Sequence, residues 1–314
     1  MSSVPKRYFP GWSRLFAKSD GPFPNTLAND IDHPHVAPKV GPDLLSGRGR
    51  PDLAQQAKTV IVTTHGFAAT PFENHYLLDW LCQSERYLGS RVMLGAHGES
   101  VEAFRQASWQ DWQAPLEREL RALEQLGYRD QVVITTSTGG TLLLDLLSRN
   151  HFPAIRKLVM VAPIIEPFDK VMRAAPFGRR SGLIGSIANT FDDDWIGCWY
   201  RELPISAIEQ LDLLTRRVRA LLRRGLKLPS ELQVLIVQSR RDIIVDRRSA
   251  FAIADGLSQN HVELLLLDSQ WHLPILPRAD AREEAIKAWV YGRILEFLQR
   301  EQLPPDRHYR PESP

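Results

Sequence analysis

The stretch "ITTSTGGT", Ile134–Thr141, joins an apolar run that predicts a strand to an apolar run that predicts a helix. Ser137 stands at the corner between them, with Gly139 and Gly140 just behind it. A sharp turn of this kind can expose a serine above a sheet, and small residues are needed because strand and helix pass closely there. The usual pattern is G-x-S-x-G, and Thr135 takes the place of the first glycine. The stretch therefore predicts an exposed serine nucleophile, with a helix-capping serine as the simpler alternative.

Strands and helices alternate along the chain on both sides of this turn. Short apolar or β-branched runs predict strands at residues 59–64, 90–94, 131–136, 155–163, 232–239 and 261–268. Apolar residues at helical spacing predict helices at about residues 72–83, 109–127, 139–150, 248–257 and 281–302. Such alternation, with strands that are apolar along their whole length, is typical of a parallel sheet covered on both faces. We therefore expect an α/β protein whose mostly parallel central sheet is flanked by helices.

The alternation is absent in two parts of the chain. Residues 1–57 are rich in Pro, Gly, Asn and Asp and have no periodicity, so we expect an N-terminal arm ahead of a domain at residues 58–314. Between about residues 164 and 229 the alternation breaks again. An insertion at this point predicts a cap over the carboxyl edge of the sheet, where open α/β sheets bind ligands.

The composition does not call for nucleic acid as a partner. Lys and Arg number 39 and Asp and Glu number 37, so the formal net charge is only +2. Cys82 and Cys198 lie far apart without metal-ligand spacing, which favours a reducing compartment. The first residues lack the pattern of a secretory signal, and no stretch approaches the roughly twenty apolar residues of a membrane helix. We expect a cytoplasmic protein without an integral membrane segment.

Two residues further along the chain could activate Ser137. A serine hydroxyl is a poor nucleophile until a base takes its proton, and the base is normally a histidine held by a carboxylate. After a turn of this kind the order along the chain is Ser, then Asp or Glu, then His. Asp242 follows the strand predicted at 232–239, and His272 follows the strand predicted at 261–268. Because the carboxyl ends of parallel strands share one edge of a sheet, we expect Ser137, Asp242 and His272 to form a catalytic triad there.

Other residues could take these places. Asp246 could supply the carboxylate, although it lies farther from the end of its strand than Asp242 does. His261 starts its strand and so belongs at the opposite edge of the sheet. His97, in "GAHGES", has the simpler role of stabilising a loop. His272 is therefore the histidine that we expect to act as the base.

The same reaction needs N–H groups that stabilise the developing oxyanion. One should be the backbone N–H of Thr138, the residue after the nucleophile. The other should come from the loop "THGFAATP", residues 64–71, where Gly66 allows the backbone to approach closely. The N–H of Phe67 is the natural second donor in this loop.

Taken together, these motifs resemble the α/β-hydrolase superfamily, and within it the small bacterial carboxylesterases and monoacylglycerol lipases. The resemblance rests on "HGFAATP", "LGAHGES", "ASWQDW", "TSTGG", "RRDIIVD" and "WHLP", in this order between about residues 59 and 298. The sequence departs from the usual pattern at Thr135, at "GAHG" in place of P-G-H-G, and at Trp271, where glycine is frequent. None of these departures removes a catalytic group, and Thr135 leaves an altered activity open.

The resemblance implies a serine hydrolase that cleaves short- to medium-chain acyl esters or monoacylglycerols through an acyl-enzyme. Its partner would be a small-molecule acyl ester, and no metal or organic cofactor is implied. An acyltransferase, a thioesterase or an amidase would use the same triad, and a non-catalytic binding protein could keep the fold. The oligomeric state stays open.

The predicted cap offers two further features. Trp195 and Trp199 could line the acyl pocket, because acyl chains need apolar walls, or could anchor the cap to the body. The arginine-rich amphipathic helix predicted at about residues 205–224 could make transient contact with a lipid surface. The alternative, which we favour, is that this helix packs its apolar face on the body and leaves its arginines in water.

Overall fold

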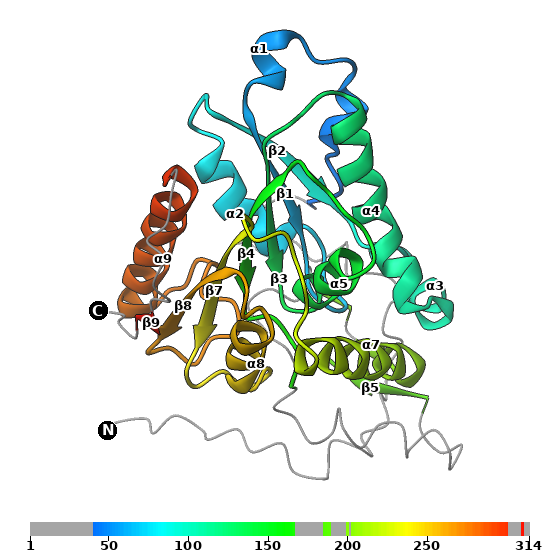
Figure 1. The fold of residues 1–314 in the computed structure, drawn as a ribbon. Helices are drawn as coiled ribbons and strands as arrows, with labels where there is room; N and C mark the ends of the chain where they lie inside the picture. Colours follow the sequence, from blue (N-terminus) through cyan, green and yellow to red (C-terminus); the bar gives the residue numbers. More distant parts are fainter. Residues whose placement is uncertain (1–39, 167–184, 190–198, 201, 301–308, 311–314) are drawn as a thin grey trace.

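The alternating strands form one central sheet in the computed structural model, with helices on both sides of it (Figure 1). The structure describes residues 40–166, 185–189, 199–200, 202–300 and 309–310. Within these residues the sheet has seven strands in the order β2-β1-β3-β4-β7-β8-β9, and each neighbouring pair runs parallel. The strands are β1 (Thr59–Thr64), β2 (Tyr87–Val92), β3 (Gln131–Thr136), β4 (Ile155–Val161), β7 (Gln233–Ser239), β8 (His261–Leu267) and β9 (Tyr309–Arg310). The expected α/β class with a mostly parallel sheet is confirmed.

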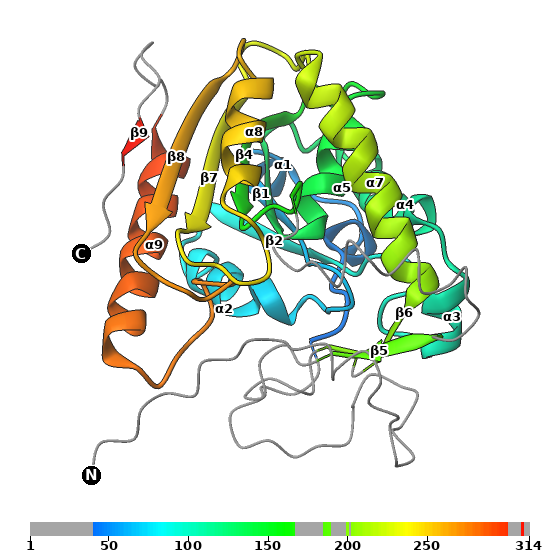
Figure 2. The ribbon, with the colours of Figure 1, turned by 90° about the horizontal axis from the view of Figure 1, so that it is seen from below.

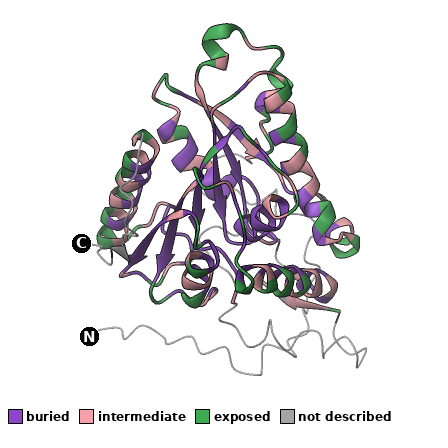
Figure 3. Ribbon diagram, viewed as in Figure 1, coloured by how far each residue is buried: buried purple, intermediate pink, exposed green. Residues whose placement is uncertain are grey.

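Two layers of helices cover the sheet. The helices outside the insertion are the 3-10 helix η2 (Leu45–Arg48), α1 (Leu53–Gln56), α2 (Phe72–Leu81), α3 (Val101–Gln106), α4 (Trp109–Gln125), α5 (Thr138–Leu147), α8 (Arg248–Gly256) and α9 (Ala281–Gln299). One sheet face packs against α4, α5 and α8, and the other packs against α2 and α9. Successive strand residues divide between these faces, so that Val60 and Val62 face one layer and Ile61 faces the other. Burial on both faces explains why the strands are apolar throughout (Figure 3).

The strand register brings the carboxyl ends of neighbouring strands to one level. Thr136, at the end of β3, pairs with Val161 of β4. Val161 pairs with Val237 of β7, and Val237 pairs with Leu265 of β8. The loops that follow β3, β7 and β8 therefore leave the sheet at the same edge. These loops hold the three residues predicted to form the triad.

The insertion between β4 and β7 contains a small hairpin-like pair and a long helix. The pair is β5 (Ser186–Ala188) with β6 (Glu202–Pro204), which run antiparallel, and the helix is α7 (Ile205–Arg223). Figure 2 shows α7 lying beside α5 and α8, which it contacts. Its buried residues recur at helical spacing and are Ile205, Ala207, Ile208, Leu211, Leu214, Thr215, Val218 and Leu222. The apolar face of α7 thus packs on the body, which is the alternative that we favoured from the sequence. That the insertion caps a substrate site stays a prediction.

Several predicted boundaries need correction. The second strand was expected at residues 90–94 but is β2, because β1 pairs along its whole length from Thr59 opposite Tyr87 to Thr64 opposite Val92. Leu94 lies beyond this ladder, and its N–H donates instead to Nε2 of His65 at 3.0 Å. The short elements η2, α1, α3, β5, β6 and β9 were not predicted. Elements this short carry too little periodicity to stand out in a sequence.

The predicted N-terminal arm, residues 1–57, lies partly outside the described residues. Its described part runs beside β2, where Asp43 forms an isolated bridge with Arg91. The side chain of Leu45 is buried in the core, so this part of the arm packs on the domain. In the described part of the chain, no helix is both long enough and apolar enough to cross a membrane.

Candidate active site

Ser137 occupies a strained turn between β3 and α5. Its φ of 46° and ψ of −114° lie in a region that non-glycine residues rarely adopt. The surrounding backbone holds it there, because its N–H donates to the carbonyl of Val161 at 2.9 Å and its carbonyl accepts from Gly140 at 3.1 Å. Its side chain makes no capping hydrogen bond to α5, so the helix-capping alternative is wrong. Strain of this kind at a hydroxyl is typical of functional sites.

The glycines around Ser137 let three backbone segments meet. A Cβ at Gly139 would lie 2.7 Å from the carbonyl oxygen of His65, so only glycine fits between α5 and the end of β1. A Cβ at Gly66 would lie 3.0 Å from Cβ of Ser137, which places the loop after β1 directly against Ser137.

The second glycine behind the turn accommodates Thr135. A Cβ at Gly140 would lie 3.1 Å from Oγ1 of Thr135 and 2.9 Å from Cε of Met160. Because Gly140 has no side chain, Thr135 fits where the usual pattern has glycine. Gly140, in the first turn of α5, thus provides the space for Thr135, at which the sequence departs from the usual pattern.

Asp242 and His272 form a buried pair at the same edge of the sheet. Nδ1 of His272 lies 2.7 Å from Oδ2 of Asp242. The other carboxylate oxygen accepts the N–H groups of Ile244 at 2.8 Å and Val245 at 3.0 Å, and Gln238 donates to Oδ2 at 3.1 Å. These donors fix the carboxylate and leave it aimed at the imidazole.

The electrostatic surroundings favour the charged form of His272. Its burial by itself lowers the pKa of the imidazole, but the negative charges of Asp242 and Glu73 outweigh burial. The net result is a pKa of His272 that is raised above its ordinary value. The ring can therefore accept a proton readily, as a general base must.

The rival residues have other partners. Asp246 forms an ion pair with Arg248 at 2.6 Å. His261 begins β8 and so lies at the opposite edge of the sheet. His97 holds a loop, because its Nε2 accepts the N–H of Ala68 at 3.2 Å. Burial lowers the pKa of His97 to about 4, so this ring stays neutral at pH 7.

The loop after β1 presents one backbone N–H between two that are already bonded. The N–H of Gly66 donates to Oε2 of Glu73 at 2.7 Å, and that of Ala68 donates to His97. Among the described residues, the N–H groups of Phe67 and Thr138 have no protein acceptor. Both predicted oxyanion donors are thus available, and the neighbours of Phe67 are fixed on either side.

Of the two tryptophans predicted to line the acyl pocket, the structure describes only one. Trp195 lies outside the described residues. Trp199 is 3% exposed, packs with Phe72 and Leu273, and donates from Nε1 to Oε1 of Glu73 at 3.0 Å. Its burial against the body fits the anchoring alternative, and a role in substrate binding stays a prediction. Tyr200 also connects the insertion to the body, because its N–H donates to the carbonyl of Ala68 at 2.9 Å.

The first residues of the insertion are fixed as well. The hydroxyl of Ser249, on α8, accepts the N–H of Ile165 at 3.1 Å and that of Glu166 at 2.8 Å. The carboxylate of Glu166 also lies 3.0 Å from Nε of Arg219 on α7. The segment between Glu166 and Trp199 therefore starts and ends at residues that are bonded to the body.

Sequence reasoning missed Glu73, which is buried beside the candidate triad at 3% exposure. An acid in the first turn of a helix has an ordinary explanation in the helix dipole, so the residue did not stand out. Its spacing held a signal: Glu73, Leu77 and Leu81 recur every four residues and share one face of α2. A carboxylate on an apolar helix face needs buried partners.

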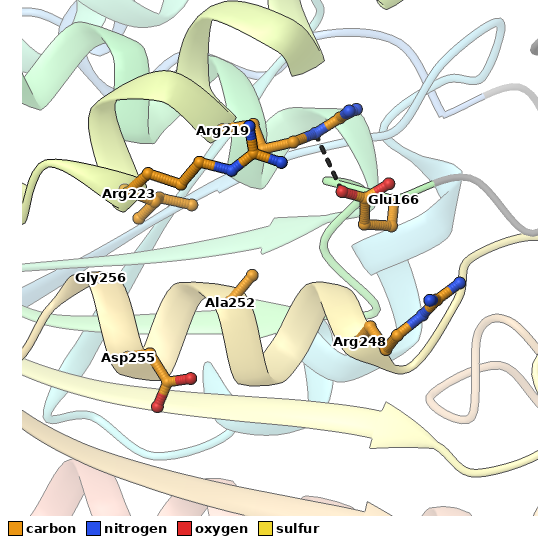
Figure 4. A pocket seen from close by; sticks show the side chains of 8 residues that line it. Glu166, Arg219, Arg223, Arg248, Ala252, Asp255 and Gly256 are labelled. Atoms are coloured by element: carbon orange, nitrogen blue, oxygen red, sulfur yellow. Dashed lines mark ion pairs between the residues drawn. The ribbon is translucent and has the colours of Figure 1, made fainter.

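A cavity of about 460 Å³ lies elsewhere, between α7 and α8. Figure 4 shows Arg219 and Arg223 reaching from α7 toward Glu166, with Arg248 and Asp255 on α8. None of the candidate catalytic residues lines this cavity. Its charges are mixed and Arg219 is already paired with Glu166, so it gives no clear preference for a ligand.

The parallel sheet, its two helical layers and the three loops at its carboxyl edge define the α/β-hydrolase fold. A solved structure from the metagenome-derived lipolytic enzymes LipS and LipT matches with a TM-score of 0.63 and 21% identity, over 77% of this chain and 94% of that chain. The monoacylglycerol lipase of Paleococcus ferrophilus matches with a TM-score of 0.57 and 14% identity, over 76% of this chain and 93% of that chain.

A soluble variant of the monoglyceride lipase of Saccharomyces cerevisiae matches with a TM-score of 0.59 and 14% identity, over 77% of this chain and 86% of that chain. At such identities the likeness shows the fold alone. No protein-family model and no curated protein matches the sequence.

Proposed function

We propose that this protein is a serine hydrolase that cleaves short- to medium-chain acyl esters or monoacylglycerols. The observation that carries the proposal is the 2.7 Å contact between His272 and Asp242, on the sheet edge where Ser137 occupies a strained turn. A hydroxyl, an imidazole and a carboxylate in this chain order are the groups that acyl transfer requires.

In the proposed reaction, Oγ of Ser137 attacks the acyl carbonyl while Nε2 of His272 takes the hydroxyl proton. Asp242 keeps the imidazole oriented and stabilises its charged form. The N–H groups of Phe67 and Thr138 receive the oxyanion of the tetrahedral intermediate. His272 then protonates the leaving alcohol, which leaves the acyl group on Oγ of Ser137. Water next attacks the acyl carbonyl and gives its proton to His272, and His272 returns that proton to Oγ of Ser137 as the acid departs.

An apolar cluster beside the oxyanion loop favours an acyl substrate. Ile205 and Ile208, in the first turn of α7, are buried together, and Phe67, Ile187 and Leu203 pack against them. Phe67 thus offers a backbone N–H for the carbonyl oxygen, and its apolar ring packs on this cluster. Acyl chains need apolar walls of this kind.

One other observation bears on the substrate class. The solved structures that share the fold include a monoacylglycerol lipase and a monoglyceride lipase. We also propose that Trp195 and Trp199, which belong to the insertion, line the acyl pocket. The choice between short-chain esters and monoacylglycerols is left to the chain-length profile.

The test is hydrolysis of p-nitrophenyl esters from acetate to laurate, and of matching monoacylglycerols. Ser137→Ala should lower kcat by roughly 10⁴-fold or more, because the nucleophile is removed. Ser148→Ala is the matched control, since that hydroxyl donates only to the carbonyl of Asp145 at the end of α5. Equal rates in the wild type and Ser137→Ala would refute the proposal. A folded wild type that cleaves none of these esters would favour a binding role.

A further inference from the structure

Glu73 joins three parts of the candidate site through its two carboxylate oxygens. Oε2 accepts the N–H of Gly66 in the oxyanion loop at 2.7 Å and also the hydroxyl of Thr136, the residue before the nucleophile. Oε1 accepts Nε1–H of Trp199, from the insertion, at 3.0 Å. The partners Gly66 and Trp199 can only donate, so a carboxylate, which only accepts, satisfies both.

The position of Glu73 places it next to the nucleophile. A Cβ at Gly66 would lie 3.0 Å from Cβ of Ser137 and 3.2 Å from Oε2 of Glu73. The carboxylate is therefore packed behind the same loop residue that touches the serine. With His97 bonded to Ala68 on the other side, Glu73 fixes the backbone that precedes the N–H of Phe67.

Glu73 also acts on His272 through its charge. The charged groups that influence His272 among the described residues are Asp242, from the loop after β7, and Glu73, from α2. The influence is mutual: burial raises the pKa of Glu73, and the charge of His272 partly offsets that rise. A second negative charge near the imidazole stabilises its protonated form.

We propose that Glu73 is a positioning residue that holds the N–H of Phe67 at the oxyanion site and supplies a second negative charge to His272. The proposal deepens the proposed function and rests on it. In this role Glu73 does not contact the reacting atoms. Its effect passes through Gly66, through Trp199 and through the charge state of the base.

The test compares the wild type with Glu73→Gln, which keeps the shape of the side chain. An amide presents one oxygen and one NH₂, so either Gly66 or Trp199 must face a donor. We expect kcat to fall about tenfold or more with a smaller change in KM, because a misplaced donor weakens transition-state binding. We also expect the acid limb of the kcat/KM profile to move to lower pH, because His272 loses a negative neighbour.

Two further variants separate the roles of Glu73. In Glu73→Gln with Trp199→Phe, the amide oxygen can accept from Gly66 while NH₂ meets no donor, so kcat should partly recover. Glu73→Asp keeps the charge but shortens the reach, so kcat should fall while the acid limb stays at its wild-type pH. The matched control is Glu117→Gln on α4, whose carboxylate pairs only with Arg121 on the surface; it should match the wild type.

Folded Glu73→Gln with wild-type kcat and an unmoved acid limb would overturn the proposal, as would full kcat in Glu73→Asp. If the wild type cleaves no ester, the proposed function fails by itself, and NMR titration of the His272 ring still tests Glu73 without a substrate. A lower pKa of His272 in Glu73→Gln would then support the charge interaction, and an unchanged one would refute it.

Discussion

Nδ1 of His272 and Oδ2 of Asp242 lie 2.7 Å apart, although thirty residues separate them along the chain. The contact favours the ring tautomer that carries its proton on Nδ1, because that N–H then donates to the carboxylate. Under the proposed function, Nε2 would take the serine proton.

Asp242→Asn should lower kcat by roughly 10³- to 10⁴-fold, because an amide no longer selects the tautomer in which Nε2 is unprotonated. The variant keeps the size of the side chain, and thermal unfolding measured beside kcat shows that it is folded. Steady-state kinetics on a p-nitrophenyl ester measures the effect. Asp246→Asn is the control, since Asp246 pairs with Arg248 rather than with His272; an equal loss in both variants would contradict the assignment.

Activity should fall as the pH drops through the pKa of His272, because a protonated imidazole cannot take the serine proton. The pKa of His272 is raised above 6.5, as Asp242 and Glu73 outweigh the opposing effect of burial. The acid limb of kcat/KM should therefore lie above pH 6.5 in the wild type. A limb below that value would show that the two carboxylates do not control the base.

The stability of the fold should depend on the same histidine with the opposite sign to activity. Because the folded protein binds the proton of His272 more tightly than the unfolded chain, this residue stabilises the fold at low pH. That stabilisation is lost as the pH rises through the folded pKa. Urea unfolding of wild type and His272→Gln at several pH values measures it, and a parallel pH dependence in both would speak against the interaction.

His97 should weaken the fold on the acid side. Burial lowers the pKa of His97 from 6.5 to about 4, so the unfolded chain binds more protons between these values and stability falls as the pH drops through them. The full effect is about 3 kcal/mol. His97→Gln, whose amide oxygen can still accept from Ala68, should flatten the dependence of the unfolding free energy on pH in this window. An unchanged slope would mean that other groups dominate acid unfolding.

Gly139→Ala should abolish activity and lower stability, because the new Cβ would lie 2.7 Å from the carbonyl oxygen of His65. The backbone there cannot yield without moving Ser137 or the oxyanion loop. Gly292→Ala, in α9, is the matched control because its Cβ would meet no atom within 4 Å. That substitution should stabilise the protein by about 0.5–1 kcal/mol, as alanine favours helix more than glycine does. Thermal unfolding and kcat of both variants decide the matter.

The sequence was sufficient for the sheet but not for every boundary. The strands at 59–64 and 131–136 were placed correctly because buried β-branched runs with turn residues behind them leave little choice. The strand β2 was misplaced because its limits come from the register with β1, which depends on a partner far away in the chain. Its sequence, with Gly89 and Arg91 inside, has no pattern of its own that marks these limits.

Part of the candidate site could be predicted from the sequence, and part of it could not. Ser137, Asp242 and His272 follow strand ends, so the rule that parallel strands share an edge was enough to place them at one edge of the sheet. Whether they form a triad stays a prediction. Glu73 was not predicted, because its importance depends on Gly66, Thr136 and Trp199, which meet only in the folded chain. The fit of Thr135 could not be predicted from the sequence for a similar reason, since it depends on the space left by Gly140.

The fixed ends of the insertion have a consequence for protein engineering. Glu166 is bonded to α8 and Trp199 to Glu73, so the body holds both points at which a replacement segment would be joined. A grafted flexible segment of another length should be tolerated between them, because closing such a segment costs only about 0.6 kcal/mol more for each doubling of its length. The body should therefore accept segments exchanged between these two points, and under the proposed function new substrate preferences could be selected without rebuilding the core.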